Sequence, residues 1–309
     1  MMLSVCSVVV VLLFVTESAV ANTSSGVASA IGGGTQNVAS GFASFVGAGT
    51  LNTAAGLVAS VLGGTSNTAS GSNSGVGNGE GNVASAEWAW VGGGSANIAS
   101  DKAATIGGGA WNTASYFGAT VAGGSTNVAD SYGAAIIGGV RNSAGYYATV
   151  GGGADNSASF HGVVAGGGDN YANNFAAVSG GQDNSASSFA SAVLGGANNG
   201  ATSAFTSVGG GWSNTASVTY ATVSGGEINT ASAFAGTVAG GSGNSASGAF
   251  AAIGGGQTNS AGGQKATIGG GSSNSAAAYA STVGGGMFNS ASGEFSSVVG
   301  GQSNVASYF

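Results

Sequence analysis

The chain has 309 residues, of which three are basic, ten are acidic and one is histidine, whereas 64 are glycine and none is proline. The formal net charge of -7 excludes the basic surface that nucleic-acid binding needs. Disorder is disfavoured as well, because 43% of the residues are hydrophobic and they recur periodically.

Residues 1–21 have the features of a secretory signal peptide. An apolar run is followed by polar residues and by a small-residue cleavage site, Ala19-Val20-Ala21. The run is too short to span a bilayer, so we expect no membrane span in the mature chain. The only cysteine, Cys6, lies in this leader, and a mature chain beginning at Asn22 has neither thiol nor disulfide. The sequence therefore predicts a secreted protein, either extracellular or on the cell surface.

A repeat of fourteen or fifteen residues fills residues 22–309, which we treat as one glycine-rich domain. Each unit follows N-T-A-S-x-x-x-A-T-V-G-G-G-x-x, with positions counted from the asparagine. Three consecutive intervals, between Asn142 and Asn184, span fourteen residues, and the other sixteen span fifteen. The twenty repeat asparagines are Asn22, Asn37, Asn52, Asn67, Asn82, Asn97, Asn112, Asn127, Asn142, Asn156, Asn170, Asn184, Asn199, Asn214, Asn229, Asn244, Asn259, Asn274, Asn289 and Asn304.

Two short strands are expected in each repeat, as in 244–247 and 251–254. Position 3 is alanine in all but the first repeat, position 10 is valine or isoleucine, and position 9 between inward residues is often threonine. This alternation is typical of a strand with one buried face. The predicted fold is all-β: a single-chain β-solenoid, or β-roll, of nineteen to twenty coils with two short parallel-stacked strands each. The expected core includes Ile106, Val121, Val208, Val223, Val238, Ile253, Ile268 and Val283.

Glycine runs at positions 11 to 13 indicate a second turn with positive φ. Most aromatic and charged residues fall at positions 4 to 7 or 14 to 15, where the coil turns, for example Phe234 and Trp212. A helix could not carry two or three glycines every fifteen residues, and collagen needs a G-x-y period and proline.

Stacking of coils is needed for stability. Burying one valine stabilises by about 1.5–3 kcal/mol, less than the cost of ordering a coil at about 1.5 kcal/mol per residue. We expect backbone ladders between coils and a column of asparagine amides, a role in which each asparagine also satisfies its local turn. The clearest members are Asn97, Asn112, Asn214, Asn229 and Asn244.

Candidate sites are few. Asp155, Asp169 and Asp183 each directly precede a repeat asparagine, so stacking would hold the three carboxylates in one column. Either they are solvated turn residues or a cation bridges them, and calcium is the natural oxygen-seeking ion. Asn22-Thr23-Ser24 is an N-glycosylation sequon. His161 has no second histidine as partner and is expected at the surface.

No catalytic constellation is apparent in the sequence. The serines lack a base, no cysteine follows the leader, and the glycine runs are not followed by the lysine and helix of a phosphate loop. We therefore expect a protein that is not an enzyme and has no cofactor other than a possible calcium ion.

Units such as Asn244–Gly256 and Asn289–Gly301 resemble the head repeats of YadA-like trimeric autotransporter adhesins. The resemblance implies a left-handed β-roll of 14- to 15-residue coils, three chains packed together, and binding to host or matrix surfaces. Two features depart from that family: A-T-V-G-G-G replaces its S-V-A-I-G motif, and neither stalk nor membrane anchor follows the repeats.

Three functions fit the sequence. The leading hypothesis is a structural element of an extracellular filament, coat or matrix; the second is an adhesin head that binds matrix or surface ligands; the third is an ice-binding protein. Because the repeats start after the leader and continue to Phe309 without a polar cap, we expect self-association, either end to end in filaments or laterally in homotrimers.

Overall fold

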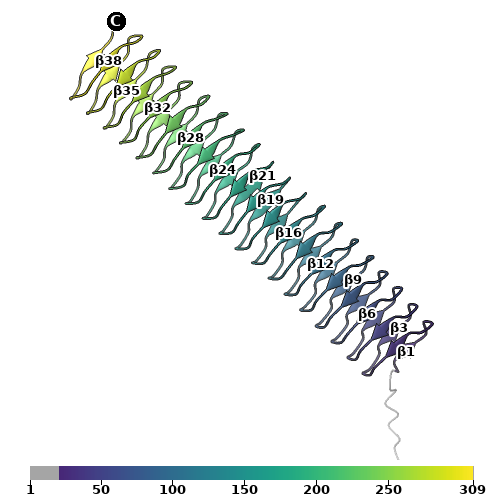
Figure 1. Ribbon diagram of the computed structural model, residues 1–309. Helices are drawn as coiled ribbons and strands as arrows, with labels where there is room; N and C mark the ends of the chain where they lie inside the picture. The colour runs from purple at the N-terminus through teal and green to yellow at the C-terminus, as the bar shows by residue number, and fades with distance from the viewer. Residues whose placement is uncertain (1–20, 309) are drawn as a thin grey trace, which may run out of the picture.

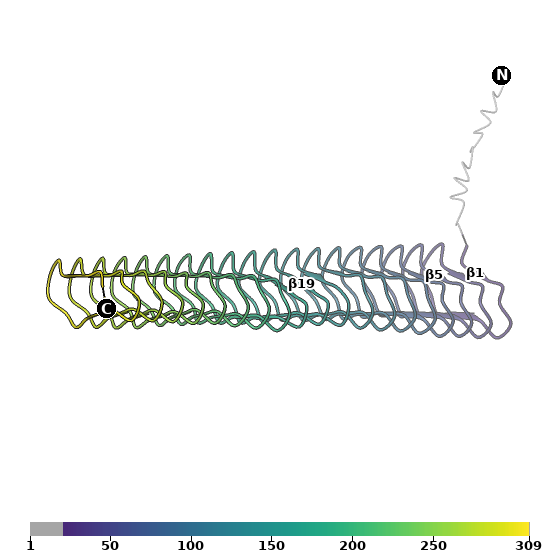
Figure 2. The same cartoon turned by 90° about the horizontal axis from the view of Figure 1, so that it is seen from above.

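The computed structural model describes residues 21–308, which form an all-β solenoid without a helix. The coils stack in one row from β1 to β39, as Figure 1 shows, and follow a single axis when seen from above (Figure 2). The predicted fold class is confirmed: consecutive coils pair in parallel, at intervals of fourteen or fifteen residues. The expected leader, apart from Ala21, lies outside the described residues.

Every complete coil contributes one strand to each of two parallel sheets. The 20-stranded first sheet contains β1 (Thr23–Ser24), β3 (Val38–Ala39), β5 (Thr53–Ala54), β7 (Thr68–Ala69), β9 (Val83–Ala84), β11 (Ile98–Ala99), β13 (Thr113–Ala114), β15 (Val128–Ala129), β17 (Ser143–Ala144), β19 (Ser157–Ser159), β21 (Tyr171–Asn173), β23 (Ser185–Ala186), β25 (Gly200–Ala201), β27 (Thr215–Ala216), β29 (Thr230–Ala231), β31 (Ser245–Ala246), β33 (Ser260–Ala261), β35 (Ser275–Ala276), β37 (Ser290–Ala291) and β39 (Val305–Ala306).

The second sheet contains the strands that follow the first turn of each coil. They are β2 (Ala30–Ile31), β4 (Phe45–Val46), β6 (Ser60–Val61), β8 (Gly75–Val76), β10 (Trp90–Val91), β12 (Thr105–Ile106), β14 (Thr120–Val121), β16 (Ala135–Ile136), β18 (Thr149–Val150), β20 (Val163–Val164), β22 (Ala177–Val178), β24 (Ala192–Val193), β26 (Ser207–Val208), β28 (Thr222–Val223), β30 (Thr237–Val238), β32 (Ala252–Ile253), β34 (Thr267–Ile268), β36 (Thr282–Val283) and β38 (Ser297–Val298).

The register places equivalent repeat positions on top of one another. In the second sheet Thr222 lies opposite Ser207 on one side and Thr237 on the other. A third line of single parallel bridges, such as Trp212 with Glu227, joins the coils at position 14. Because the strands are so short, each coil depends on its neighbours for its backbone hydrogen bonds, as expected for a solenoid.

Small side chains fill the narrow interior. Alanine at position 3, alanine at position 8 where it occurs, and valine or isoleucine at position 10 form one continuous hydrophobic cluster. The repeat asparagines from Asn37 to Asn289 are buried as well. The core residues expected from the sequence are all at most 1% exposed: Ile106, Val121, Val208, Val223, Val238, Ile253, Ile268 and Val283.

Left-handed backbone is more widespread than the glycine pattern predicts. The last glycine of each run has positive φ, as Gly226 does with +91°, but so do residues with side chains at positions 7 and 15. Tyr220 has φ of +63° and Ile228 has φ of +54°. Non-glycine residues avoid this region at a cost of about 1–2 kcal/mol each. Bonds between coils hold them there: the N–H of Ile228 donates to the carbonyl of Trp212 at 2.9 Å.

Within residues 21–308, no helix has the length and apolar character needed to cross a membrane.

Candidate functional surfaces

The repeat asparagines form one hydrogen-bonded column. Asn229 accepts the backbone N–H of Asn244 through its Oδ1 at 3.0 Å. Its Nδ2 donates to the carbonyl of Gly225 in the preceding turn at 2.9 Å and to the carbonyl of Gly241 in the next coil at 2.8 Å. One amide therefore joins two coils and closes the glycine turn before it.

The same pattern extends along the solenoid. The expected members Asn97, Asn112, Asn214, Asn229 and Asn244 are all buried, and each accepts the N–H of the next repeat asparagine at 2.9–3.0 Å. The ladder role and the turn role suggested by the sequence thus coincide in one side chain. Since buried amides without partners are costly, each asparagine stabilises the fold through its full set of bonds.

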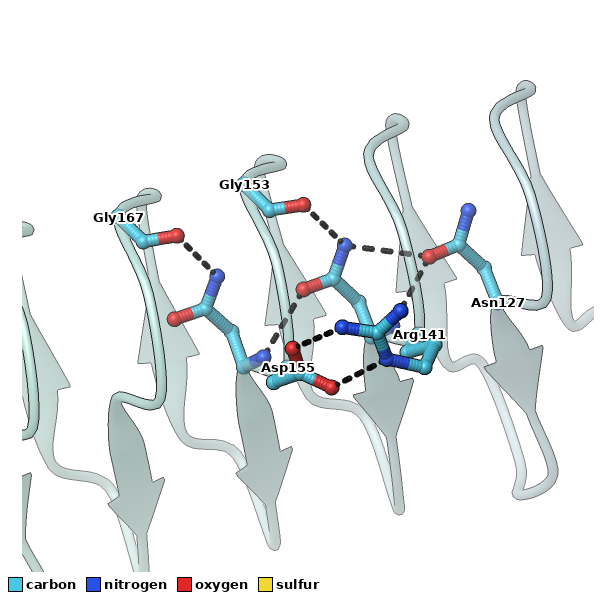
Figure 3. Close-up of polar contacts among 7 residues, drawn as sticks. Asn127, Arg141, Gly153, Asp155 and Gly167 are labelled. Atoms are coloured by element: carbon cyan, nitrogen blue, oxygen red, sulfur yellow. Dashed lines mark hydrogen bonds and ion pairs between the residues drawn. The ribbon is translucent and has the colours of Figure 1, made fainter.

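A second column consists of the residues that directly precede the asparagines, and it includes the three expected aspartates. Asp155 pairs with Arg141, one coil earlier in the same column (Figure 3). Arg141 donates from Nε to Oδ1 at 2.7 Å and from Nη2 to Oδ2 at 2.6 Å. The hydrogen bonds from Arg141 lower the pKa of the Asp155 carboxyl, and the same bonds and charge raise the pKa of Arg141.

Calcium binding at the three aspartates stays a prediction. In the part of the chain that the structure describes, no three or more His, Cys, Asp or Glu side chains are grouped so as to hold a metal ion. Asp155, Asp169 and Asp183 all have φ near +55°, which places them in the turn. The charge that offsets Asp155 is the guanidinium of Arg141, which directly precedes Asn142 as Asp155 precedes Asn156.

In ten successive coils the first turn, between the two strands, carries a continuous line of aromatic side chains. We call this line the aromatic ridge. It comprises Tyr116, Phe117, Tyr132, Tyr146, Tyr147, Phe160, His161, Phe175, Phe189, Phe205, Tyr220, Phe234 and Phe250. The ridge covers ten successive coils, from the one beginning at Asn112 to the one beginning at Asn244.

Rings in neighbouring coils contact one another along the whole ridge. The ring centroids of Phe205 and Tyr220 are 5.2 Å apart and nearly parallel, whereas those of Phe234 and Phe250 are 5.4 Å apart and packed edge to face. His161 stacks on Phe175 at 4.5 Å, so the surface position expected for it is part of the ridge. Burial among these rings raises the pKa of the Tyr147 phenol.

Charged side chains flank the ridge. On the N-terminal side Lys102 pairs with Glu87 at 3.0 Å and lies over the ring of Trp88 at 4.5 Å. On the C-terminal side the ammonium of Lys265 lies 5.4 Å from the ring centroid of Tyr279. Exposed pairs of this kind contribute little stability.

The sequon asparagine belongs to the asparagine column. Asn22 donates from Nδ2 to the carbonyl of Gly34 at 2.9 Å and accepts the N–H of Asn37 at 3.0 Å. Glycosylation at Asn22 stays a prediction.

Comparison with protein-family models gives no match to the chain, and comparison with curated proteins gives none either.

Proposed function

We propose that this protein is an extracellular structural repeat protein, a stiff rod that forms or decorates a filament, coat or matrix. The observation that carries the proposal is the unbroken asparagine column from Asn22 to Asn304, in which the Oδ1 of each asparagine accepts the backbone N–H of the next. Neighbouring coils are tied together by backbone and amide bonds instead of a thick core, and such an arrangement resists bending and coil separation.

The length of the rod is the direct test. Nineteen coils at about 4.8 Å each give a rod about 90 Å long. Negative-stain micrographs of the purified protein should show straight rods of this length or filaments and sheets built from them. Short, flexible or globular particles would contradict the proposal.

An adhesin head is the second candidate, and the coil geometry favours it. Coils of fourteen and fifteen residues, with two short parallel strands each, are what the resemblance to YadA-like adhesin heads implies. We expect an adhesin to be retained on surfaces coated with collagen or fibronectin, against an albumin-coated control. Equal retention on all three surfaces would contradict the adhesin function and leave the structural role as the remaining candidate.

The register gives the ice-binding hypothesis no comparable support. On the second sheet, paired threonines such as Thr222 and Thr237 are followed by Ala252 in the next coil. A regular threonine lattice would need longer unbroken columns than this.

A further inference from the structure

The aromatic ridge exposes more apolar surface than a soluble monomer usually carries. Eleven of its rings are 39–51% exposed, and at roughly 200 Å² per aromatic side chain they present about 1,000 Å² in one line. Contiguous apolar patches on monomers rarely exceed a few hundred Å². Contact between two such ridges would bury about 1,000–2,000 Å² in total, which is the size of a specific protein interface.

The regular spacing of the rings along the ridge restricts which partner can match it over its whole length. Its rings recur with every coil, at about 4.8 Å, over ten coils. A partner whose own repeat differs by about one tenth would be out of step by about a whole coil at the far end. A second copy of the chain has the same spacing by necessity, so its rings can stay in step over the full ridge.

The three fourteen-residue repeats favour a parallel over an antiparallel orientation of the two copies. They lose one residue in the first turn, which is the turn that carries the ridge, so the ridge changes shape between Asn142 and Asp183. A parallel copy in register places short turns against short turns. An antiparallel copy centred on the ridge would place them against the fifteen-residue coils of residues 184–228.

Charge also permits contact between copies. In the ten first turns of the ridge, Asp130 is the only formally charged residue, and the remaining positions are mostly Ser, Thr, Ala, Gly and Asn. Apart from Asp130, which is exposed near the N-terminal end of the ridge, two ridges can therefore approach without burying unpaired charges, which would otherwise oppose association.

We propose that the aromatic ridge is a lateral self-association surface, on which a second copy of the chain binds in parallel and in register. The proposal deepens the structural role given above and rests on it. It turns a single rod into a laterally bonded pair or bundle, with the rings buried between copies and the hydrogen-bonded sheets facing outward.

Removal of four rings tests the surface. The variant replaces Phe189, Phe205, Tyr220 and Phe234 by alanine, which the chain itself has at the same repeat positions in Ala190 and Ala204. Sedimentation velocity of the wild-type protein should show an oligomer, and the variant should self-associate at least about 100-fold more weakly. The matched control removes exposed aromatics elsewhere, with Trp111→Ala, Trp212→Ala and Phe288→Ser, and should stay oligomeric.

A second variant keeps every ring. Ala190→Lys with Ala235→Lys adds charge beside the ridge, at the repeat position where Lys265 occurs naturally. In a parallel register each new lysine faces its own copy, so association should be lost at low salt and partly recovered at high salt. The circular dichroism spectrum should remain that of the wild type, which shows that the coils still fold and stack.

Disulfide trapping tests the direction. In a Cys6→Ser background, Ala235→Cys should form a linked dimer under mild oxidation, because parallel copies bring residue 235 against itself. Ala197→Cys, at position 14 and away from the ridge, should not. An antiparallel pair would separate the two copies of residue 235 by about seven coils, or about 34 Å, and give no link.

A monomeric wild-type protein, an oligomer that survives both ridge variants, or the absence of the 235 crosslink would each overturn the proposal. These outcomes are distinct from failure of the structural role. Micrographs that show single 90 Å rods without lateral contacts would agree with the structural role but contradict the self-association surface. Particles that are not rods would contradict both proposals.

Discussion

Asn214 accepts the backbone N–H of Asn229 through Oδ1 at 2.9 Å, and this bond is repeated between every pair of neighbouring coils whose asparagines are described. The amide of Asn214 also donates to the carbonyls of Gly210 and Gly226, at 2.8 and 2.7 Å. Both ends of the side chain are therefore used, and no other residue type offers an acceptor and two donors in so short a side chain.

Replacing Asn214 by alanine should destabilise the solenoid by about 3 kcal/mol or more, because one N–H and two carbonyls lose a partner in a buried site. The measurement is the midpoint of urea unfolding followed by circular dichroism. Asn78→Ala is the control: Asn78 is exposed, Ala48 occupies the same repeat position, and the expected change is within about 0.5 kcal/mol. Similar unfolding midpoints for the two variants would contradict the claim that the asparagine column stabilises the solenoid.

Aspartate substitutions can distinguish the inward-facing from the outward-facing positions of a strand. Val208 is fully buried, and Val208→Asp should cost at least about 3 kcal/mol through lost burial and an unpaired charge. Thr222 in the next coil points outward between Ser207 and Thr237, so Thr222→Asp should change stability only slightly. Melting curves of the two proteins compare them directly, and equal melting temperatures would contradict the register.

The repeat made the fold and the core predictable, because the period is strict. Once a position is inferred to be buried in one repeat, the same position is expected to be buried in all of them. Val208 and Asn214 could be placed from spacing alone. The left-handed backbone at Tyr220 and Ile228 could not, since intrinsic preference favours glycine or asparagine there and only the bonds between coils overcome it. Sequence preference is local, and this conformation is imposed by stacking.

The column of residues before the asparagines and the aromatic ridge were harder to predict from the sequence, for a different reason. Arg141 precedes Asn142 as directly as Asp155 precedes Asn156, so stacking in register places the two charges in one column and their pairing follows from the sequence. The aromatic ridge uses positions 5, 6 and 7 interchangeably. Phe205 and Phe234 differ by one position and still belong to one line, which a count at any single position does not detect.

Buried serines offer a stabilising change. Ser44, Ser74 and Ser296 are at most 4% exposed and their hydroxyls have no hydrogen-bond partner. Ser74→Ala should therefore raise stability by about 1 kcal/mol, and the neighbouring coils already have Ala59 and Ala89 at this position. The control is Ser191→Ala, since the Ser191 hydroxyl donates to the carbonyl of Ser188 at 2.8 Å and its loss should not stabilise. Unfolding midpoints decide between the two.

The ion pair of Arg141 and Asp155 predicts a pH dependence. The hydrogen bonds from Arg141 hold the folded-state pKa of Asp155 below its unfolded value. The pair therefore stabilises the fold above the unfolded pKa, and this contribution is lost as pH falls through the folded pKa. Arg141→Gln should raise the pKa of Asp155 toward its ordinary value in a carboxyl NMR titration. Arg141→Lys, which keeps the charge and loses the two-point geometry, should give an intermediate value.

The glycine runs provide the most local test of the stacking geometry. A Cβ on Gly226 would collide with the carbonyl oxygen of Gly241 in the next coil and lie 2.6 Å from Nδ2 of Asn229, and φ there is +91°. A Cβ on the adjacent Gly225 would lie 3.9 Å from the carbonyl oxygen of Gly210, an ordinary van der Waals contact. The two glycines are neighbours in sequence, but only Gly226 lies against the next coil.

Gly226→Ala should cost about 3 kcal/mol or more, because the collision is with backbone and the left-handed conformation adds its own strain. Gly225→Ala should be neutral or stabilising by up to about 1 kcal/mol, since it restricts the unfolded chain without a clash. Thermal and urea unfolding of the two single variants measure the difference. If Gly226→Ala unfolds at the wild-type midpoint, the coils cannot be as closely stacked at this turn as the carbonyl of Gly241 requires.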